Sequence, residues 1–158
     1  MTKKAGVKGS LYAILAVSAG MALVLLVVFL IKLTTNPNVV KMIADDFQEF
    51  AFPVIAGILS IFLSAYYLGK IAGVKIGRNN KAQSSIGFIA ALKILTVFSL
   101  IVSIAVVIQI SWLSGFDAYL SFYFLLRIAV PIFLLGLPLA LLLGYGFEYL
   151  LSNKLKKS

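Results

Sequence analysis

Four long apolar stretches are the feature that most constrains how this chain folds. They run over about residues 11–33, 52–69, 86–113 and 119–151. A helix of about 20 apolar residues crosses the hydrocarbon core of a bilayer, and lipid excludes spanning structures whose backbone groups are not paired internally. The sequence therefore predicts an all-α integral membrane protein, a four-helix transmembrane bundle in which residues 1–158 form a single transmembrane domain.

The connections between these stretches are short. The longest, residues 34–51, lies well below the size of a folded domain. Within it, Asn36-Pro37-Asn38 ends the first helix, because proline cannot continue one. Apolar side chains then recur on one helical face, at Val39, Val40, Ile43, Phe47 and Phe50. This spacing predicts one short amphipathic helix on the extracytoplasmic membrane surface.

Charge alternates in sign along the connections. The first nine residues, the second connection and the C-terminal tail are basic, whereas the first and third connections carry most of the acids. The second connection contains Lys70, Lys75, Arg78 and Lys81. Because cytoplasmic segments of membrane proteins are enriched in lysine and arginine, we predict that both termini and this connection are cytoplasmic, in a cell membrane (plasma or inner).

The same four basic residues are candidate contacts for lipid headgroups. The formal net charge is +9. In a soluble domain such a charge would favour nucleic acid, but here the membrane accounts for it, so we expect membrane lipids and no nucleic acid as partners. The first apolar stretch exceeds the 7–15 apolar residues of a signal peptide and no small-x-small cleavage site follows it, so we expect it to be retained.

A ladder of small residues closes the second stretch. Ala65, Gly69, Gly73 and Gly77 follow one another at intervals of four. Small residues at this spacing let another helix approach closely, so the ladder is a candidate helix-packing surface, within the chain or between subunits. The alternative is a frayed helix end whose glycines belong to a loop.

Two prolines, Pro131 and Pro138, lie inside the fourth stretch. Proline removes a backbone hydrogen bond, so a bent helix is predicted there. A shift of 78 residues also aligns four pairs of identical residues: Gly9 with Gly87, Ala13 with Ala91, Pro53 with Pro131 and Tyr67 with Tyr145. These matches hint at a parallel repeat of two hairpins, although chance produces matches readily in so apolar a sequence.

Lys93 and Arg127 are the charged residues inside the predicted spans. An ionisable group in lipid is unfavourable by about 3 kcal/mol, and the only acid near a span on the side of Lys93 is Glu148. Both cations lie close enough to a helix end to extend to the headgroups. The alternative is that they meet a carboxylate of another protein, an anionic lipid or an anionic solute.

The chain lacks the groups that most chemistry needs. It has no cysteine and no histidine, which excludes thiol nucleophiles, disulfides, and thiolate or imidazole metal ligands. Asp45, Asp46 and Glu49 could hold a hard cation weakly, but a solvated helix face explains them better. We therefore predict no catalytic, cofactor or metal site.

These properties favour a non-enzymatic accessory or structural subunit of a membrane protein complex. The small size, the short connections and the cations without an obvious partner in the chain all favour it. The first alternative is a small-solute channel or transporter that acts as an oligomer, and the two cations would favour an anion as its solute. The second is a membrane protein that binds anionic lipids. The partners expected are membrane lipids, with other membrane subunits or further copies of this chain.

Overall fold

The computed structural model describes residues 2–35, 50–79 and 85–156. Within these ranges the chain forms four helices: α1 (Thr2–Thr35), α3 (Ala51–Asn79), α4 (Ser85–Ser114) and α5 (Ala118–Lys156). Each is long and apolar enough to cross a membrane. The predicted all-α, four-helix transmembrane bundle is confirmed, and the chain is a multi-pass membrane protein. The predicted amphipathic helix falls within residues 36–49, outside the described part of the chain.

The helices extend beyond the apolar stretches that predict them. α1 begins at Thr2 rather than near residue 11, and α3 continues past residue 69 to Asn79. Both extensions carry lysines, so the helices continue as they leave the apolar layer. α4 and α5 begin within one residue of the predicted starts, and α5 runs to Lys156.

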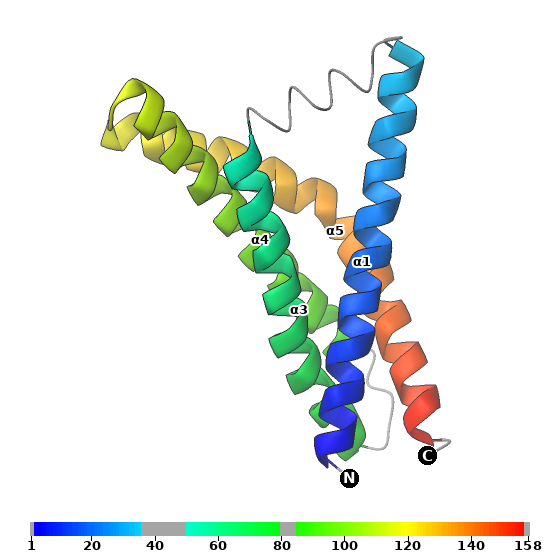
Figure 1. The fold of residues 1–158 in the computed structure, drawn as a ribbon. Helices are drawn as coiled ribbons and strands as arrows, with labels where there is room; N and C mark the ends of the chain where they lie inside the picture. The colour runs from blue at the N-terminus through cyan, green and yellow to red at the C-terminus, as the bar shows by residue number, and fades with distance from the viewer. Residues whose placement is uncertain (1, 36–49, 80–84, 157–158) are drawn as a thin grey trace.

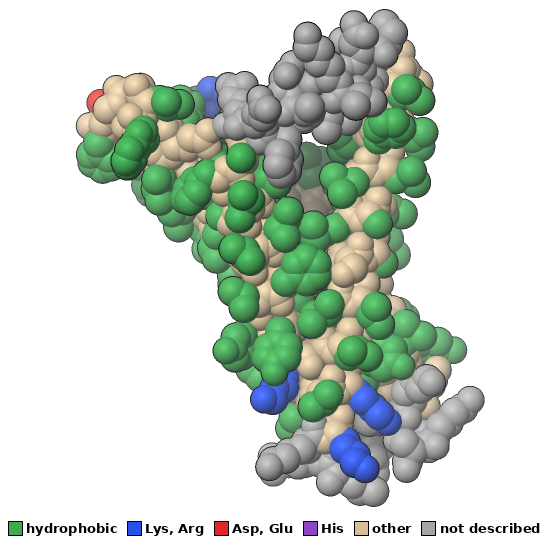
Figure 2. All heavy atoms as spheres, in the orientation of Figure 1, with side chains coloured by type: hydrophobic (Ala, Val, Ile, Leu, Met, Phe, Trp, Pro, Cys, Tyr) green, Lys and Arg blue, Asp and Glu red, His purple; other side chains and the backbone are tan. Residues whose placement is uncertain are grey.

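Both termini lie at one end of the molecule, together with the last turn of α3 and the first turn of α4 (Figure 1). We call this the basic end, because described lysines of α1 and α3 lie there, and the space-filling view shows them beside the chain ends (Figure 2). The opposite end, where α4 turns into α5, is the hairpin end. Successive spans therefore alternate in direction.

The helices pack in two close pairs. α1 contacts α3, α4 contacts α5, and the pairs are joined mainly through α3 and α4, whereas contacts between α1 and α5 are sparse. α1 diverges from the other helices toward the hairpin end (Figure 1). The bundle is thus closed on three flanks and open between α1 and α5.

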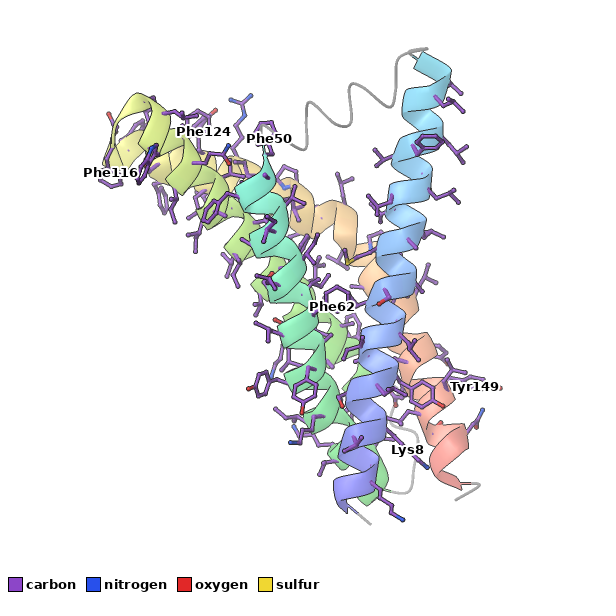
Figure 3. All side chains as sticks on the ribbon, viewed as in Figure 1. Lys8, Phe50, Phe62, Phe116, Phe124 and Tyr149 are labelled. Atoms are coloured by element: carbon purple, nitrogen blue, oxygen red, sulfur yellow. The ribbon has the colours of Figure 1, made fainter. Side chains whose placement is uncertain are left out.

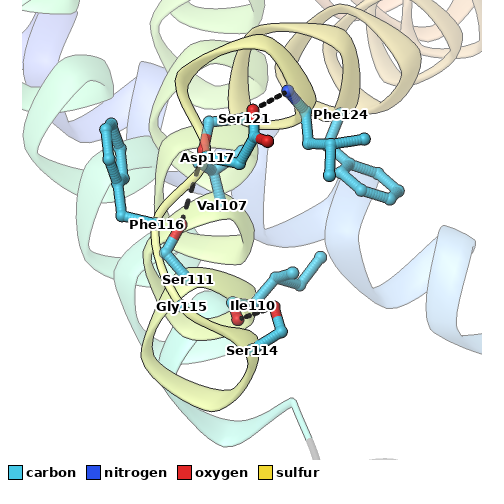
Figure 4. Close-up of a pocket in the computed structure, with 10 residues that line it drawn as sticks. Val107, Ile110, Ser111, Ser114, Gly115, Phe116, Asp117, Ser121 and Phe124 are labelled. Atoms are coloured by element: carbon cyan, nitrogen blue, oxygen red, sulfur yellow. Dashed lines mark hydrogen bonds between the residues drawn. The ribbon is translucent and has the colours of Figure 1, made fainter.

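A tight turn joins α4 to α5 at the hairpin end (Figure 4). Gly115 has a φ of 87°, a left-handed conformation that glycine adopts without strain, and its N–H donates to Ser111 O at 3.0 Å. Asp117 then caps α5, since its Oδ1 accepts a hydrogen bond from Leu120 N at 3.0 Å. This turn holds α4 and α5 antiparallel.

Candidate functional site: an apolar cleft within the membrane

A cavity with a volume of about 780 Å³ lies on the open flank, between α1, α4 and α5, and Ile61 and Gly69 of α3 also contribute to its lining. All of its lining residues are hydrophobic or glycine. Its walls include Ala16, Gly20, Val24 and Val27 of α1, Ala91 and Leu95 of α4, and Ile132, Gly136 and Leu139 of α5. We call this cavity the α1–α5 cleft. Its apolar walls fit an apolar occupant and offer nothing to hold an ion.

α1 approaches α5 closely at Gly20, partway along the cleft, whose lining continues toward the basic end as far as Ala13. A Cβ on Gly20 would lie 2.6 Å from Leu143 Cδ1, so this glycine lets the two helices meet. Beyond Gly20, toward the hairpin end, the other described helices leave most of the surface of α1 exposed. Leu23 to Leu30 are all exposed, with Leu25 at 66%. The cleft therefore widens from Gly20 toward the hairpin end.

The bend in α5 forms the facing wall. Pro131 and Pro138 both lie inside this helix, and Figure 1 shows it changing direction about midway along its length. Pro138 has no N–H to donate to the carbonyl of Leu134, so the series of backbone hydrogen bonds in α5 is interrupted there. Gly136 lies between the prolines, where a Cβ would meet Leu95 Cδ1 at 2.5 Å. The bent segment thus stays in contact with α4 while α1 diverges.

Lys93 and Arg127 lie outside the cleft. Lys93 is exposed, and it is not among the residues of α4 that line the cleft. Arg127 is also exposed, and its guanidinium carbon lies 5.8 Å from the ring centre of Tyr123, one turn earlier in α5. Neither forms an ion pair with a carboxylate among the described residues. Extension to the headgroups and pairing with another molecule both stay predictions.

Most of the small-residue ladder of α3 packs against α1. Ala65 is fully buried, and a Cβ on Gly69 would collide with Ala13 Cβ. A Cβ on Gly73 would lie 2.8 Å from Gly9 Cα, so the two backbones touch. The structure therefore places these small residues at a contact within the chain, which we call the α1–α3 seam. Gly77 is exposed and lies beyond it.

The basic residues of the second connection lie at the basic end. Lys70 and Lys75 are exposed on α3. Arg78 is described only as part of the α3 backbone, and Lys81 lies outside the described residues. Lys4 of α1 is exposed at the same end, and Lys8 is half-buried (Figure 3). Described lysines of two adjacent helices therefore converge at one membrane boundary.

Glu148 has a role that the sequence does not reveal. Only 3% of it is exposed, and its Oε2 accepts a hydrogen bond of 2.9 Å from Gly87 N in the first turn of α4. The first N–H groups of a helix lack partners within the helix, so this carboxylate caps α4 from α5. Its other oxygen, Oε1, has no hydrogen-bond partner among the described residues. Glu148 thus bonds to a backbone group rather than to Lys93.

A second cavity, of about 330 Å³, lies beside the α4–α5 turn (Figure 4). Its polar groups already serve the turn. Ser114 Oγ donates to Ile110 O at 2.8 Å, and the hydroxyls of Ser111 and Ser121 lie 3.5 Å apart. Asp117 is occupied as the cap of α5. These groups stabilise the hairpin, and nothing in their arrangement points to a ligand.

The buried serines bond to their own helices. Ser60 Oγ donates to Gly57 O at 2.8 Å, and Ser103 Oγ donates to Ser99 O at 2.6 Å. Such back-bonding satisfies hydroxyls inside a membrane helix. No group of three potential metal ligands occurs among the described residues, and Asp45, Asp46 and Glu49 lie outside them. The α1–α5 cleft is therefore the candidate site that remains.

Comparisons with protein-family models, curated proteins and solved structures gave no significant match for this chain. The cleft, the seam and the charge distribution are therefore the features of this chain that bear on its function.

Proposed function

We propose that this protein is a non-enzymatic accessory subunit of a membrane protein complex, and that the α1–α5 cleft receives a transmembrane helix of another subunit. The observation that carries the proposal is the open flank of the bundle. α1 exposes one apolar residue after another beyond Gly20, beside a cavity lined entirely by hydrophobic residues and glycine.

A helix suits this cleft for two reasons. Membrane helices associate by close van der Waals packing, which small residues permit, and the cleft presents Ala16 on α1 and Ala91 on α4. A helix also offers a continuous ridge that lies along α1, whose exposed part beyond Gly20 runs straight toward the hairpin end. One helical occupant would therefore cover the whole open flank.

The cleft supports transport less well. Conduction of an ion or a polar solute needs polar groups along the path, and the walls of this cleft carry none. Lys93, a cation that would favour an anionic solute, is not among the residues that line the cleft. The arrangement of the described residues therefore favours a binding surface over a pore.

A matched pair of substitutions on α1 tests this proposal. Val24 lines the cleft, whereas Leu26 is exposed but not part of its lining, and the two directions differ by about 200°. We expect Val24→Trp to fill the cleft and abolish co-purification of the companion protein in mild detergent. Leu26→Trp, at the same depth, should retain it.

A photo-crosslinking residue at each of the same positions identifies the occupant. Crosslinking from position 24 but not from position 26 to one membrane protein would support the proposal. Three outcomes would overturn it: recovery of a homo-oligomer without a companion, crosslinking to lipid alone, and equal retention of the companion by both tryptophan variants.

A further inference from the structure

The side chain of Lys70 lies across the α1–α3 seam. A Cβ on Gly6 of α1 would lie 3.3 Å from Lys70 Cγ, so the aliphatic stem of this lysine packs on α1 where that helix has no side chain. Lys70 is nevertheless exposed as a whole. When the stem of a lysine is packed and the rest of the side chain is exposed, the stem has lost much of its rotational freedom. The ammonium is then confined to a small region.

Two tyrosines share the surface of α3 with Lys70. Tyr66 and Tyr67 precede it by four and three residues, which places all three on one side of the helix. Both are exposed, and their rings pack edge to face with centres 5.4 Å apart. Tyrosine is enriched at the level of the headgroups, where its ring is in apolar surroundings and its hydroxyl is hydrated.

The surroundings of this patch are positively charged. Lys75 and Lys4 are exposed at the same end of the molecule. The described acid on this side of the membrane is Glu148, which is buried and bonded to Gly87 N. Lys70 therefore faces a region whose charge complements an anion, and it lies at a membrane boundary where anionic headgroups are present.

We propose that Tyr66, Tyr67 and Lys70 form a binding site for the headgroup of an anionic phospholipid at the α1–α3 seam. The ammonium of Lys70 pairs with the lipid phosphate, and the tyrosine hydroxyls donate hydrogen bonds to lipid oxygens one turn deeper. None of the three residues lines the α1–α5 cleft, and binding of a lipid at this site requires no partner protein, so the two proposals are tested independently.

The test uses the full chain in nanodiscs of zwitterionic lipid and titrates in phosphatidylglycerol, with bound lipid counted by native mass spectrometry. Lys70→Gln should weaken retention of phosphatidylglycerol about fivefold, the loss expected for one lysine near a membrane surface. Tyr66→Phe combined with Tyr67→Phe should weaken it as well, because both hydroxyls are removed while the rings stay.

Lys70→Arg is the matched control, since it keeps a cation on a long aliphatic stem at the same position. It should retain phosphatidylglycerol as the unaltered protein does. Circular dichroism checks that each variant is folded. Equal losses in Lys70→Gln and Lys70→Arg, no loss in Lys70→Gln, or displacement of the lipid by millimolar inorganic phosphate would each overturn the proposal.

Discussion

Glu148 joins two helices through a single hydrogen bond at their shared end. A hydrogen bond between a charged oxygen and a backbone N–H contributes about 1.5–3 kcal/mol to stability, compared with about 1 kcal/mol for a neutral pair. The bond reaches across 61 residues of sequence, from α5 to the first turn of α4. It fixes where α4 begins relative to α5, and thereby places the cleft residues Ala90 and Ala91 in the following turn.

Two substitutions at this position separate the hydrogen bond from the charge. We expect Glu148→Leu to lower the free energy of unfolding by about 1–3 kcal/mol, because Gly87 N is left buried without an acceptor. Glu148→Gln keeps an acceptor oxygen and should lose less. Thermal unfolding in detergent measures both. A leucine variant as stable as the glutamine variant would contradict the role assigned to this bond.

At the scale of the elements, glycine determines how closely the helices pair. At the α1–α3 seam the backbones of Gly9 and Gly73 touch. The α4–α5 pair repeats this arrangement, since a Cβ on Gly87 would meet Gly144 O. Gly9 and Gly87 are also one of the residue pairs that a shift of 78 residues aligns. Each hairpin is therefore built around a glycine in the first turns of its first helix.

The seam is tested by placing the same side chain at a tight and at an open glycine. Gly9→Val should lower the free energy of unfolding by about 1–3 kcal/mol or more, because the added carbons overlap Gly73 Cα and Gly69 O. Gly146→Val is the control, since a Cβ there meets nothing within 4 Å. Thermal unfolding of both variants in the same detergent, without chemical denaturant, measures the two losses of stability. Equal destabilisation would show that the loss comes from valine in a helix and not from the seam.

The sequence predicts the elements better than their partners. Runs of apolar residues identify four spans, because length and hydropathy alone decide what crosses a bilayer. Which helices pair depends on small residues that meet from distant segments, and the ladder at Gly69 and Gly73 does not reveal that Gly9 faces it. The same holds for Glu148. The sequence shows an acid near the end of a span, but it does not predict the backbone N–H with which that acid forms a hydrogen bond.

The cleft is harder still to predict. It depends on the divergence of α1 and on the bend in α5, which both act over many residues. Pro131 and Pro138 predict a bend without its direction. In the sequence, the exposed apolar residues of α1 cannot be told from those of any lipid-facing helix. The open flank can be recognised only when the positions of the neighbouring helices are known.

At the scale of the whole molecule, both chain ends, the end of α3 and the start of α4 lie at one end of the bundle, and the α4–α5 turn lies at the other (Figure 1). The concentration of lysine at the first of these ends predicts that it is cytoplasmic.

Single cysteines test this orientation directly, because the chain has none of its own. In intact cells, a membrane-impermeant maleimide should label Ser114→Cys at the α4–α5 turn and leave Lys75→Cys unlabelled. In inverted vesicles the two results should exchange. Labelling of Lys75→Cys from outside intact cells would invert the topology and move the proposed lipid site to the outer leaflet.

The open flank also has a consequence for the lifetime of the protein. Beyond Gly20, α1 is held by neighbours along only part of its surface, so its hairpin-end half depends on whatever lies beside it for further packing. Under the proposed function, a copy made in excess of the complex would expose that half-helix to the proteases that clear orphan membrane proteins. The proposal therefore predicts that the abundance of this protein in the cell follows the supply of the proposed companion rather than its own rate of synthesis.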